Sequence, residues 1–532
     1  MSINKKQIWL PLLLSVSLLI GMIFGYKLHE NMGDFAPRFG KKKDLHHHIN
    51  EILALIESKY VDSISAETLQ NNTIESLINQ LDPHSYYIPA SEVEGMNDEL
   101  QGNYHGIGIQ YELLNDTVTV ISVFDQSPAQ TAGLQTGDKI LKVDTIGISG
   151  RKLNESDIKN TIRGKKGDYV NLAIIRNNKS MNLSVQRSKI LSDNIDAAYF
   201  TAPGIGYIRI ARFSGNTYEE FMEHLERLKK EGLQKLILDL RDNGGGMLDD
   251  AVQIADEFLD GNKEIVRTKG VNMPLEIYAA RRPGLFETGQ LTILINENTA
   301  SASEVLAGAV QDWNRGTIIG RRSFGKGLVQ EQFTLSDGSA VRLTVARYFT
   351  PLGRSIQKPY HSGNDNDYNS DISDRLKNGQ LYNGNTPAHK GKIFVRTDGQ
   401  KLYSEEGISP DIFIPADSAY YHISEQNTLL HETLTQIALQ FFMMNKDRLA
   451  AIKKPEELSS VLQNDAFISK AIGQINISQT SKQKTGWELV LLKELKYILS
   501  WICWNKEGYY KISNADDPVI QSAISALNKS IN

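Results

Sequence analysis

The stretch LTILINENTASASEVLAGAVQDWNRG, residues 291–316, changes its pattern near its centre. Leu291–Ile295 is a short apolar run typical of a buried strand, and the residues that follow have the apolar spacing of a helix. A strand, a loop of small residues and a helix make one β–α unit. Two serines, Ser301 and Ser303, stand where the strand gives way to the helix. The stretch therefore predicts an α/β layer with a candidate nucleophile at the start of a helix.

A second β–α unit lies upstream. LILDL (Leu236–Leu240) runs into the glycine loop RDNGGG and then into a helical pattern, and an alternating segment, Ile205–Phe213, precedes it. Successive β–α units favour parallel strands. The region is therefore expected to be α/β with a partly parallel sheet.

A serine hydroxyl needs a neighbouring base before it becomes a good nucleophile, and histidine is the usual base. No histidine occurs between His224 and His361. SFGKGLVQ (Ser323–Gln330) instead places Lys326 between two glycines. A lysine amine acts as a base when burial keeps it neutral, so a serine–lysine pair is the expected solution.

The length and composition of the chain limit the classes of protein to which it can belong. A chain of 532 residues exceeds one hydrophobic core, so several domains are expected. The net charge of −5 and the absence of a broad basic stripe argue against nucleic-acid binding. With a single cysteine and no convincing ligand spacing, we expect no metal and no organic cofactor.

The amino terminus predicts a membrane anchor. Ile8–Tyr26 has no charged residue over a length that spans a hydrocarbon core, and no small-residue cleavage pattern follows it. The expected localisation is therefore a single-pass bacterial inner-membrane protein with its catalytic part in the periplasm.

Four segments, LDLRDNGGG, NENTASASEVLAGAVQDWNRG, SFGKGLVQ and YFTPLGRSIQ, occur in this order. Together they resemble the carboxy-terminal processing peptidases, also called tail-specific proteases. The resemblance implies that Ser301 is the nucleophile, that Lys326 is the base and that Gln330 orients the lysine. It gives Asp312 a supporting role, and it implies a crotonase/ClpP-like core.

The helix that begins near Ala302 would point backbone N–H groups at the nucleophile. The N–H of Ala302 and that of Gly245 or Gly246 are therefore the candidate oxyanion hole, with the choice between the glycines left open. For Ser303 we favour the role of a helix N-cap.

Short β-type runs fill residues 104–187, and they resemble a PDZ domain. YHGIGIQYE resembles the carboxylate-binding loop of that family, and SPAQTAGLQTGDKILKVD resembles its later helix, turn and strand. The resemblance implies that backbone N–H groups bind a terminal carboxylate while the peptide adds as a strand. The residues concerned are Gly106, Ile107, Gly108 and Ile109.

The expected fold class is a multidomain α/β (α+β) protein whose protease core carries an inserted β-rich PDZ domain and flanking helical segments. The expected divisions are an anchor (1–26), a tether (27–43), a helical segment (44–90), a PDZ domain (91–188), a peptidase core (189–420, with a polar insertion at 358–392) and a carboxy-terminal helical domain (421–532).

The expected function is a serine endopeptidase that recognises protein carboxy termini. Two alternatives remain: a peptide-binding protein without turnover, and an acyl-CoA-processing enzyme of similar core fold. The expected partners are protein or peptide substrates bound through their carboxy termini, the membrane through the anchor, a second copy of the chain and an adaptor protein, with no nucleic acid.

Overall fold

The computed structural model describes Ser15 and residues 45–360, 365–384, 391–416, 428–463, 465–475 and 487–529. Its internal contacts divide the chain into two units, Met1–Leu77 and Ile78–Asn532. The segment 44–90, expected to be helical, contains α2 (Leu45–Lys59) and α3 (Ala66–Ile78).

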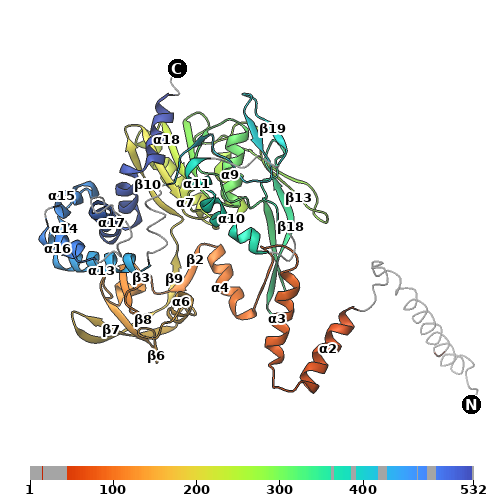
Figure 1. Cartoon of the computed structure of the whole chain (residues 1–532), viewed down its shortest axis with the longest axis horizontal. Coiled ribbons are helices and arrows are strands. Elements are labelled where there is room, and N and C mark those ends of the chain that lie inside the picture. The colour runs from red at the N-terminus through yellow and green to blue at the C-terminus, as the bar shows by residue number, and fades with distance from the viewer. Residues whose placement is uncertain are drawn as a thin grey trace, which may run out of the picture. The chain divides into compact units, whose positions relative to one another are not determined.

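A six-stranded sheet forms the centre of the second unit, and its order is β10-β11-β12-β15-β16-β21 (Figure 1). The strands are β10 (Ile195–Ala202), β11 (Ile205–Ile210), β12 (Lys235–Asp239), β15 (Gln290–Ile295), β16 (Thr317–Gly320) and β21 (Ile412–Phe413). β10 pairs antiparallel with β11, and every later pair is parallel. The expected partly parallel α/β layer is confirmed.

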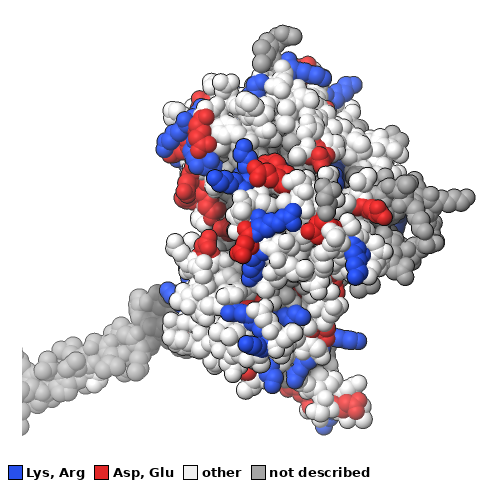
Figure 2. Space-filling view, turned by 90° about the vertical axis from the view of Figure 1, so that its left-hand side faces the viewer, with Lys and Arg blue, Asp and Glu red and all other residues white. Residues whose placement is uncertain are grey.

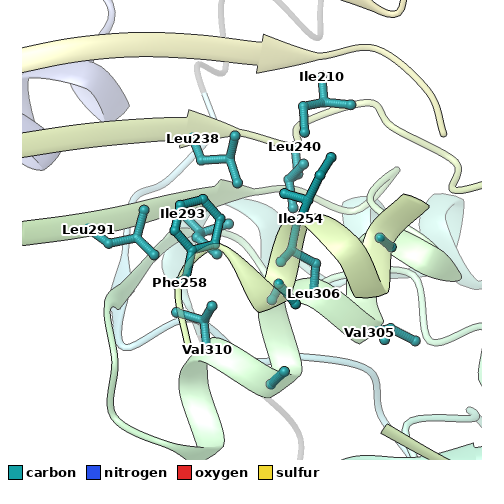
Figure 3. Packing of buried hydrophobic residues seen from close by; sticks show 14 of the residues in the cluster. Ile210, Leu238, Leu240, Ile254, Phe258, Leu291, Ile293, Val305, Leu306 and Val310 are labelled. Atoms are coloured by element: carbon teal, nitrogen blue, oxygen red, sulfur yellow. The ribbon is translucent and has the colours of Figure 1, made fainter. Parts of the chain in front are cut away.

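Helices cover both faces of this sheet. One face packs against α7 (Thr217–Lys230), α8 (Leu248–Asp256) and α9 (Ala302–Asp312). Figure 3 shows side chains of this apolar layer, among them Leu238 and Ile293 from the sheet and Phe258 and Leu306 from the helical side. The opposite face carries Ile237 and Leu294, which pack against Ile520 of α18 (Pro518–Lys529). Successive strand residues point to opposite faces, so a strand buried on both is apolar throughout.

All eleven residues of α9 are buried. The backbone of Gly308 packs closely, because a Cβ there would lie 3.1 Å from both Ile408 and Thr350. This burial explains the small residues along the helix and fixes the position of its first turn.

A second, antiparallel sheet lies beside the core. Its strands are β1 (Tyr86–Ile88), β13 (Glu264–Lys269), β14 (Glu276–Ala279), β17 (Leu328–Thr334) and β18 (Ala340–Phe349). β18 pairs with β1, β13 and β17, and at Ala340–Arg342 it lies between β1 and β17.

The β-rich module has its own core. Its sheet order is β3-β4-β5-β7-β8, with β6 paired to β5, and β3 stands at an edge. Its elements are β3 (Ile109–Leu113), β4 (Val118–Val123), α5 (Pro128–Thr131), β5 (Lys139–Val143), β6 (Ile146–Gly147), α6 (Glu155–Ile162), β7 (Tyr169–Arg176) and β8 (Lys179–Gln186). The pair β2 (Asn103–Gly106) and β9 (Ser188–Leu191) connects the module to the core at both ends.

The carboxy-terminal region is helical and packs against the β-rich module. Leu114 and Ile121 share one apolar cluster with these helices, and the two regions lie side by side in Figure 1. The helices are α13 (Thr428–Met444), α14 (Lys446–Ala450), α15 (Leu458–Leu462), α16 (Ala466–Gly473) and α17 (Trp487–Ser513). Shorter connecting elements are α4 (Ala90–Leu100), α10 (Asp365–Lys377), α11 (Gln380–Asn383), β19 (Ile393–Val395), β20 (Lys401–Tyr403) and the 3₁₀ turns at Pro455–Glu457 and Asn514–Asp516.

The expected single-pass membrane localisation is contradicted. Among the described helices, none combines the length and the apolar composition needed to cross a bilayer. The longest, α17, has 27 residues but carries charged side chains that include Glu488, Lys493 and Glu494. The expected anchor, residues 1–26, lies outside the described residues apart from Ser15.

On the face shown in Figure 2, basic and acidic side chains both occur, and in the upper part of the view they are intermixed. This distribution fits the small net charge of the chain.

Candidate active site

Ser301 is the N-cap of α9, and its backbone lies in a region that non-glycine residues rarely adopt, with φ 58° and ψ −120°. Such strain is held by surrounding contacts and is characteristic of functional turns. The Ser301 N–H donates to Glu304 Oε2 at 2.9 Å. Ser303 is therefore not the N-cap that we expected: it lies inside the helix, and its hydroxyl donates to the Asn243 carbonyl at 3.1 Å.

Lys326 stands two residues before β17, and Gln330 lies within that strand. Among the described residues, the recorded hydrogen-bond partner of Lys326 Nζ is Gln330 Oε1, at 3.1 Å. The Gln330 amide in turn donates to the carbonyl of His84. Gln330 thus holds the lysine amine from one side and is itself held by the amino-terminal segment of the core.

The surroundings of Lys326 favour its neutral form. Burial lowers the pKa of the Lys326 ammonium, and the positive charge of Arg342 lowers it further. The carboxylates of Asp82 and Glu304 oppose this shift. Because loss of water penalises a charged amine, burial is the dominant influence.

The Glu304 carboxylate connects the two candidate catalytic loops. Glu304 is fully buried, and its Oε2 accepts from the N–H of Ser301 at 2.9 Å and from the N–H of Lys326 at 2.8 Å. The two backbone nitrogens therefore lie within about 6 Å of each other. Its Oε1 accepts from the Gly325 N–H at 2.8 Å and from the Ser323 hydroxyl at 2.5 Å. Burial raises the pKa of Glu304, and these hydrogen bonds oppose the rise.

The glycine loop after β12 lies against Ser301. A Cβ on Gly245 would be 2.6 Å from the Ser301 Cβ and 2.9 Å from the Ala302 nitrogen. The N–H of Gly245 already donates to Asn243 Oδ1 at 2.8 Å. Within the described residues, no hydrogen bond is recorded for the N–H groups of Gly246 and Ala302. These two groups are therefore the donors that a developing oxyanion could use.

Asp312 is not brought to the serine and lysine. It is the last residue of α9, so the helical rise separates it from Ser301 by about 15 Å. Its carboxylate pairs with Arg354 at 2.5 Å and accepts from the Leu352 N–H at 3.0 Å. Asp312 therefore anchors the chain after β18 to the end of α9.

Sequence reasoning gave the turn at Asp82–Ser85 no role in the site. In the structure, Asp82 accepts from the Ser85 hydroxyl at 2.6 Å and from the Thr344 hydroxyl at 2.9 Å. The ring of His84 contacts the Tyr368 hydroxyl at 2.7 Å, and burial followed by the charge of Lys326 lowers the pKa of His84 to about 4. The only sequence signal for this turn was the presence of Asp82, His84 and Ser85 within four residues. No local pattern connects these residues to Gln330.

The polar insertion also reaches this region. Tyr368 on α10 is 3% exposed, and its ring packs edge-on against Phe324, inside the lysine loop. Arg375, on the same helix, donates to the carbonyls of Arg322 and Ser323. The helix therefore supports the loop that carries Lys326.

In the β-rich module, the residues expected to bind a carboxylate lie between β2 and β3. Gly106 ends β2 and Ile109 begins β3. The carbonyls of Ile107 and Gly108 accept hydrogen bonds from Ala129 and Phe124, whereas no bond from their own N–H groups is recorded within the described residues. Gly108 has φ +80°, and a Cβ there would lie 2.4 Å from the Ser127 Cβ.

Comparisons with known proteins agree with this organisation. Residues 204–369 match the model of peptidase family S41, and residues 106–186 match that of the PDZ domain. A carboxy-terminal-processing protease of Bartonella bacilliformis is 36% identical over 58% of this chain and 71% of its own length. A probable CtpA-like serine protease of Staphylococcus aureus is 33% identical over 58% of this chain and 62% of its own length.

Solved structures similar to this chain include a photosystem II D1 C-terminal processing protease, at 26% identity and a TM-score of 0.36 over 69% of this chain and 88% of that one. A PDZ domain of a carboxy-terminal protease from Vibrio cholerae, in complex with a peptide, matches at 27% identity and a TM-score of 0.15 over 16% of this chain and 97% of that one.

The α/β core and the separate PDZ domain define a serine peptidase, a hydrolase of peptide bonds. The chain belongs to the family of carboxy-terminal-processing proteases, within peptidase family S41.

Proposed function

We propose that the chain is a serine endopeptidase that cleaves proteins near their carboxy termini with Ser301 as nucleophile and Lys326 as base. One observation carries the proposal: a single oxygen of the buried Glu304 accepts hydrogen bonds from the backbone N–H groups of both residues. The partly buried amine of Lys326 supports the role of a base, because its lowered pKa increases the neutral fraction.

In the proposed reaction, Lys326 Nζ removes the Ser301 proton while Oγ attacks the scissile carbonyl. The tetrahedral oxyanion accepts from the N–H groups of Ala302 and Gly246, and the lysine returns the proton to the leaving amine. The same amine then takes a proton from the water that hydrolyses the acyl-enzyme. Gln330 keeps Nζ oriented through its 3.1 Å contact.

The PDZ domain is proposed to select substrates by their terminal carboxylate. The N–H groups of Ile107 and Gly108 have no recorded partner within the described residues, which supports their use as donors, together with those of Gly106 and Ile109. β3 stands at a sheet edge, so a substrate chain can add to it as a further strand. The division into a PDZ domain (91–188), a peptidase core (189–420) and a helical domain (421–532) belongs to this proposal, as do a homodimer and an adaptor.

The test compares wild type with Ser301→Ala and Lys326→Ala on one polypeptide prepared with a free and with an amidated carboxy terminus. Each variant should lose at least about a thousandfold in kcat, because removing either member disables the pair. Ser303→Ala, two residues away, is the matched control and should stay within about tenfold of wild type. Wild type should cleave the free-carboxylate substrate faster.

Cleavage by Ser301→Ala or Lys326→Ala at the wild-type rate would reject the proposed pair. Equal cleavage of the two substrates would reject carboxylate recognition while leaving the pair intact. Incubation of wild type with an acyl-CoA tests the alternative of an acyl-CoA-processing enzyme. The acyl-CoA should remain unchanged.

A further inference from the structure

A small cavity lies behind the loop that carries Lys326, on the side of α10 and β20. Its volume is about 260 Å³, below the range of pockets that hold drug-sized ligands. Five cationic side chains line it, and no aspartate or glutamate is among its lining residues that the structure describes. The cationic residues are Arg321, Arg322, Arg354, Arg375 and Lys401.

Two of these five charges are neutralised by buried carboxylates nearby. Arg321 pairs with Glu297 at 2.7 Å, and Arg354 pairs with Asp312 at 2.5 Å. These ion pairs account for Arg321 and Arg354 without any ligand.

The charge of Arg375 is poorly compensated. Its side chain is 3% exposed, its nearest recorded carboxylate, that of Asp371, is 3.6 Å away, and Lys358 shares that carboxylate at 3.3 Å. Its Nε has no hydrogen-bond partner among the residues that the structure describes. Burial, followed by the positive charge of Arg322, lowers the pKa of Arg375 to about 10. A buried guanidinium beside a second guanidinium is costly unless an anion balances them.

Arg322 and Lys401 add to this excess. The recorded hydrogen bond of the Arg322 guanidinium goes to the neutral carbonyl of Glu406, at 3.2 Å. Within the described residues, neither Arg322 nor Lys401 has a carboxylate within ion-pair distance. The cavity therefore holds more positive charge than its surroundings neutralise.

We propose that this cavity binds a small tetrahedral oxyanion of the phosphate class between Arg322, Arg375 and Lys401. Guanidinium groups suit such a ligand, because their planar N–H donors match its oxygens and keep their charge. Arg375 also donates to the carbonyls of Arg322 and Ser323, so an anion that neutralises Arg375 stabilises the loop leading to Lys326.

Binding is tested on the full chain by calorimetric titration with inorganic phosphate at constant ionic strength. Saturable binding is expected, and Arg322→Gln or Lys401→Gln should weaken it by about tenfold or more, since charge-assisted hydrogen bonds are lost. Lys377→Gln removes an exposed cation from the same end of α10 without touching the cavity lining, and should leave the affinity unchanged. Arg322 and Lys401 are less buried than Arg375, so both variants are expected to fold; circular dichroism and Tm check this.

Hydrogen exchange gives a second readout. Bound phosphate should slow exchange of the backbone amides of residues 322–326 in wild type and not in Arg322→Gln. Sulfate should reproduce both effects, because it shares the tetrahedral chemistry, and acetate should not.

Absence of saturable phosphate binding overturns the proposal, as does equal affinity in wild type and the cavity variants. Acetate binding as tight as that of phosphate would also overturn it. Because these measurements do not involve peptide cleavage, their outcome does not depend on whether Ser301 and Lys326 form the catalytic pair.

Discussion

Glu304 and Lys326 show how a buried carboxylate and a partly buried amine influence each other in this core. Glu304 accepts hydrogen bonds from both candidate catalytic loops, and its charge also raises the pKa of Lys326. The lowering of the Lys326 pKa therefore depends on burial and on the charge of Arg342, which together outweigh the two carboxylates. Glu304 thus influences both the position of the Lys326 loop and the pKa of the Lys326 amine. A substitution that changes the pKa without moving the loop must therefore be made at a residue that does not bond to the loop backbone.

Arg342→Gln is such a substitution. Arg342 lowers the pKa of Lys326, so its removal should raise that pKa. The neutral base is present above the pKa, and the acid limb of the kcat/KM profile should therefore move to higher pH. Arg347→Gln removes the same charge from an exposed position on β18, and its pH profile should match that of wild type. An acid limb that stays in place in Arg342→Gln would contradict the assignment of Lys326 as the base.

At the scale of elements, two loops have backbone geometries that limit their side chains. The loop before β3 needs a left-handed residue packed against Ser127, which only glycine supplies without a clash. The turn before α9 holds a serine in a similarly rare region, with its N–H fixed by Glu304.

Gly108→Ala tests the first loop. The added methyl would meet the Ser127 Cβ at 2.4 Å, so the loop must shift and its N–H groups lose their alignment. Affinity for a fluorescent peptide with a free carboxy terminus should fall by about tenfold or more, measured by anisotropy on the full chain. Gly150→Ala is the control, because it has φ +74° and nothing within 4 Å of an added Cβ. Equal affinities in the two variants would remove the loop from peptide binding.

At the scale of the whole molecule, the end of the chain completes the core. α18 covers the face of the central sheet opposite to α7, α8 and α9. The Arg241 guanidinium joins Asp239 of β12 to Asp517, just before α18, with contacts of 2.6 Å to each. The central sheet therefore packs against a helix that begins 98 residues beyond the boundary expected at 420.

Ile520→Ala measures this contribution. Ile520 is fully buried between α18 and the sheet, so its truncation should lower the free energy of unfolding by about 2–5 kcal/mol. Ser525→Ala, on the exposed side of α18, should change it by less than about 0.5 kcal/mol. Tm and urea unfolding give the values, and a loss below about 1 kcal/mol for Ile520→Ala would show that the core does not need the helix.

The sequence by itself determined the β–α units, the start of the helix at Ala302, the β-rich module and the family, because apolar spacing, glycine loops and ordered motifs are local properties of the chain. Only the tertiary structure decided which side chains meet. It brought Gln330 to His84, 246 residues away, joined Ser301 to the Lys326 loop through Glu304, and paired Asp312 with Arg354. Such contacts depend on how sheets and helices pack across the core, and no local spacing encodes them.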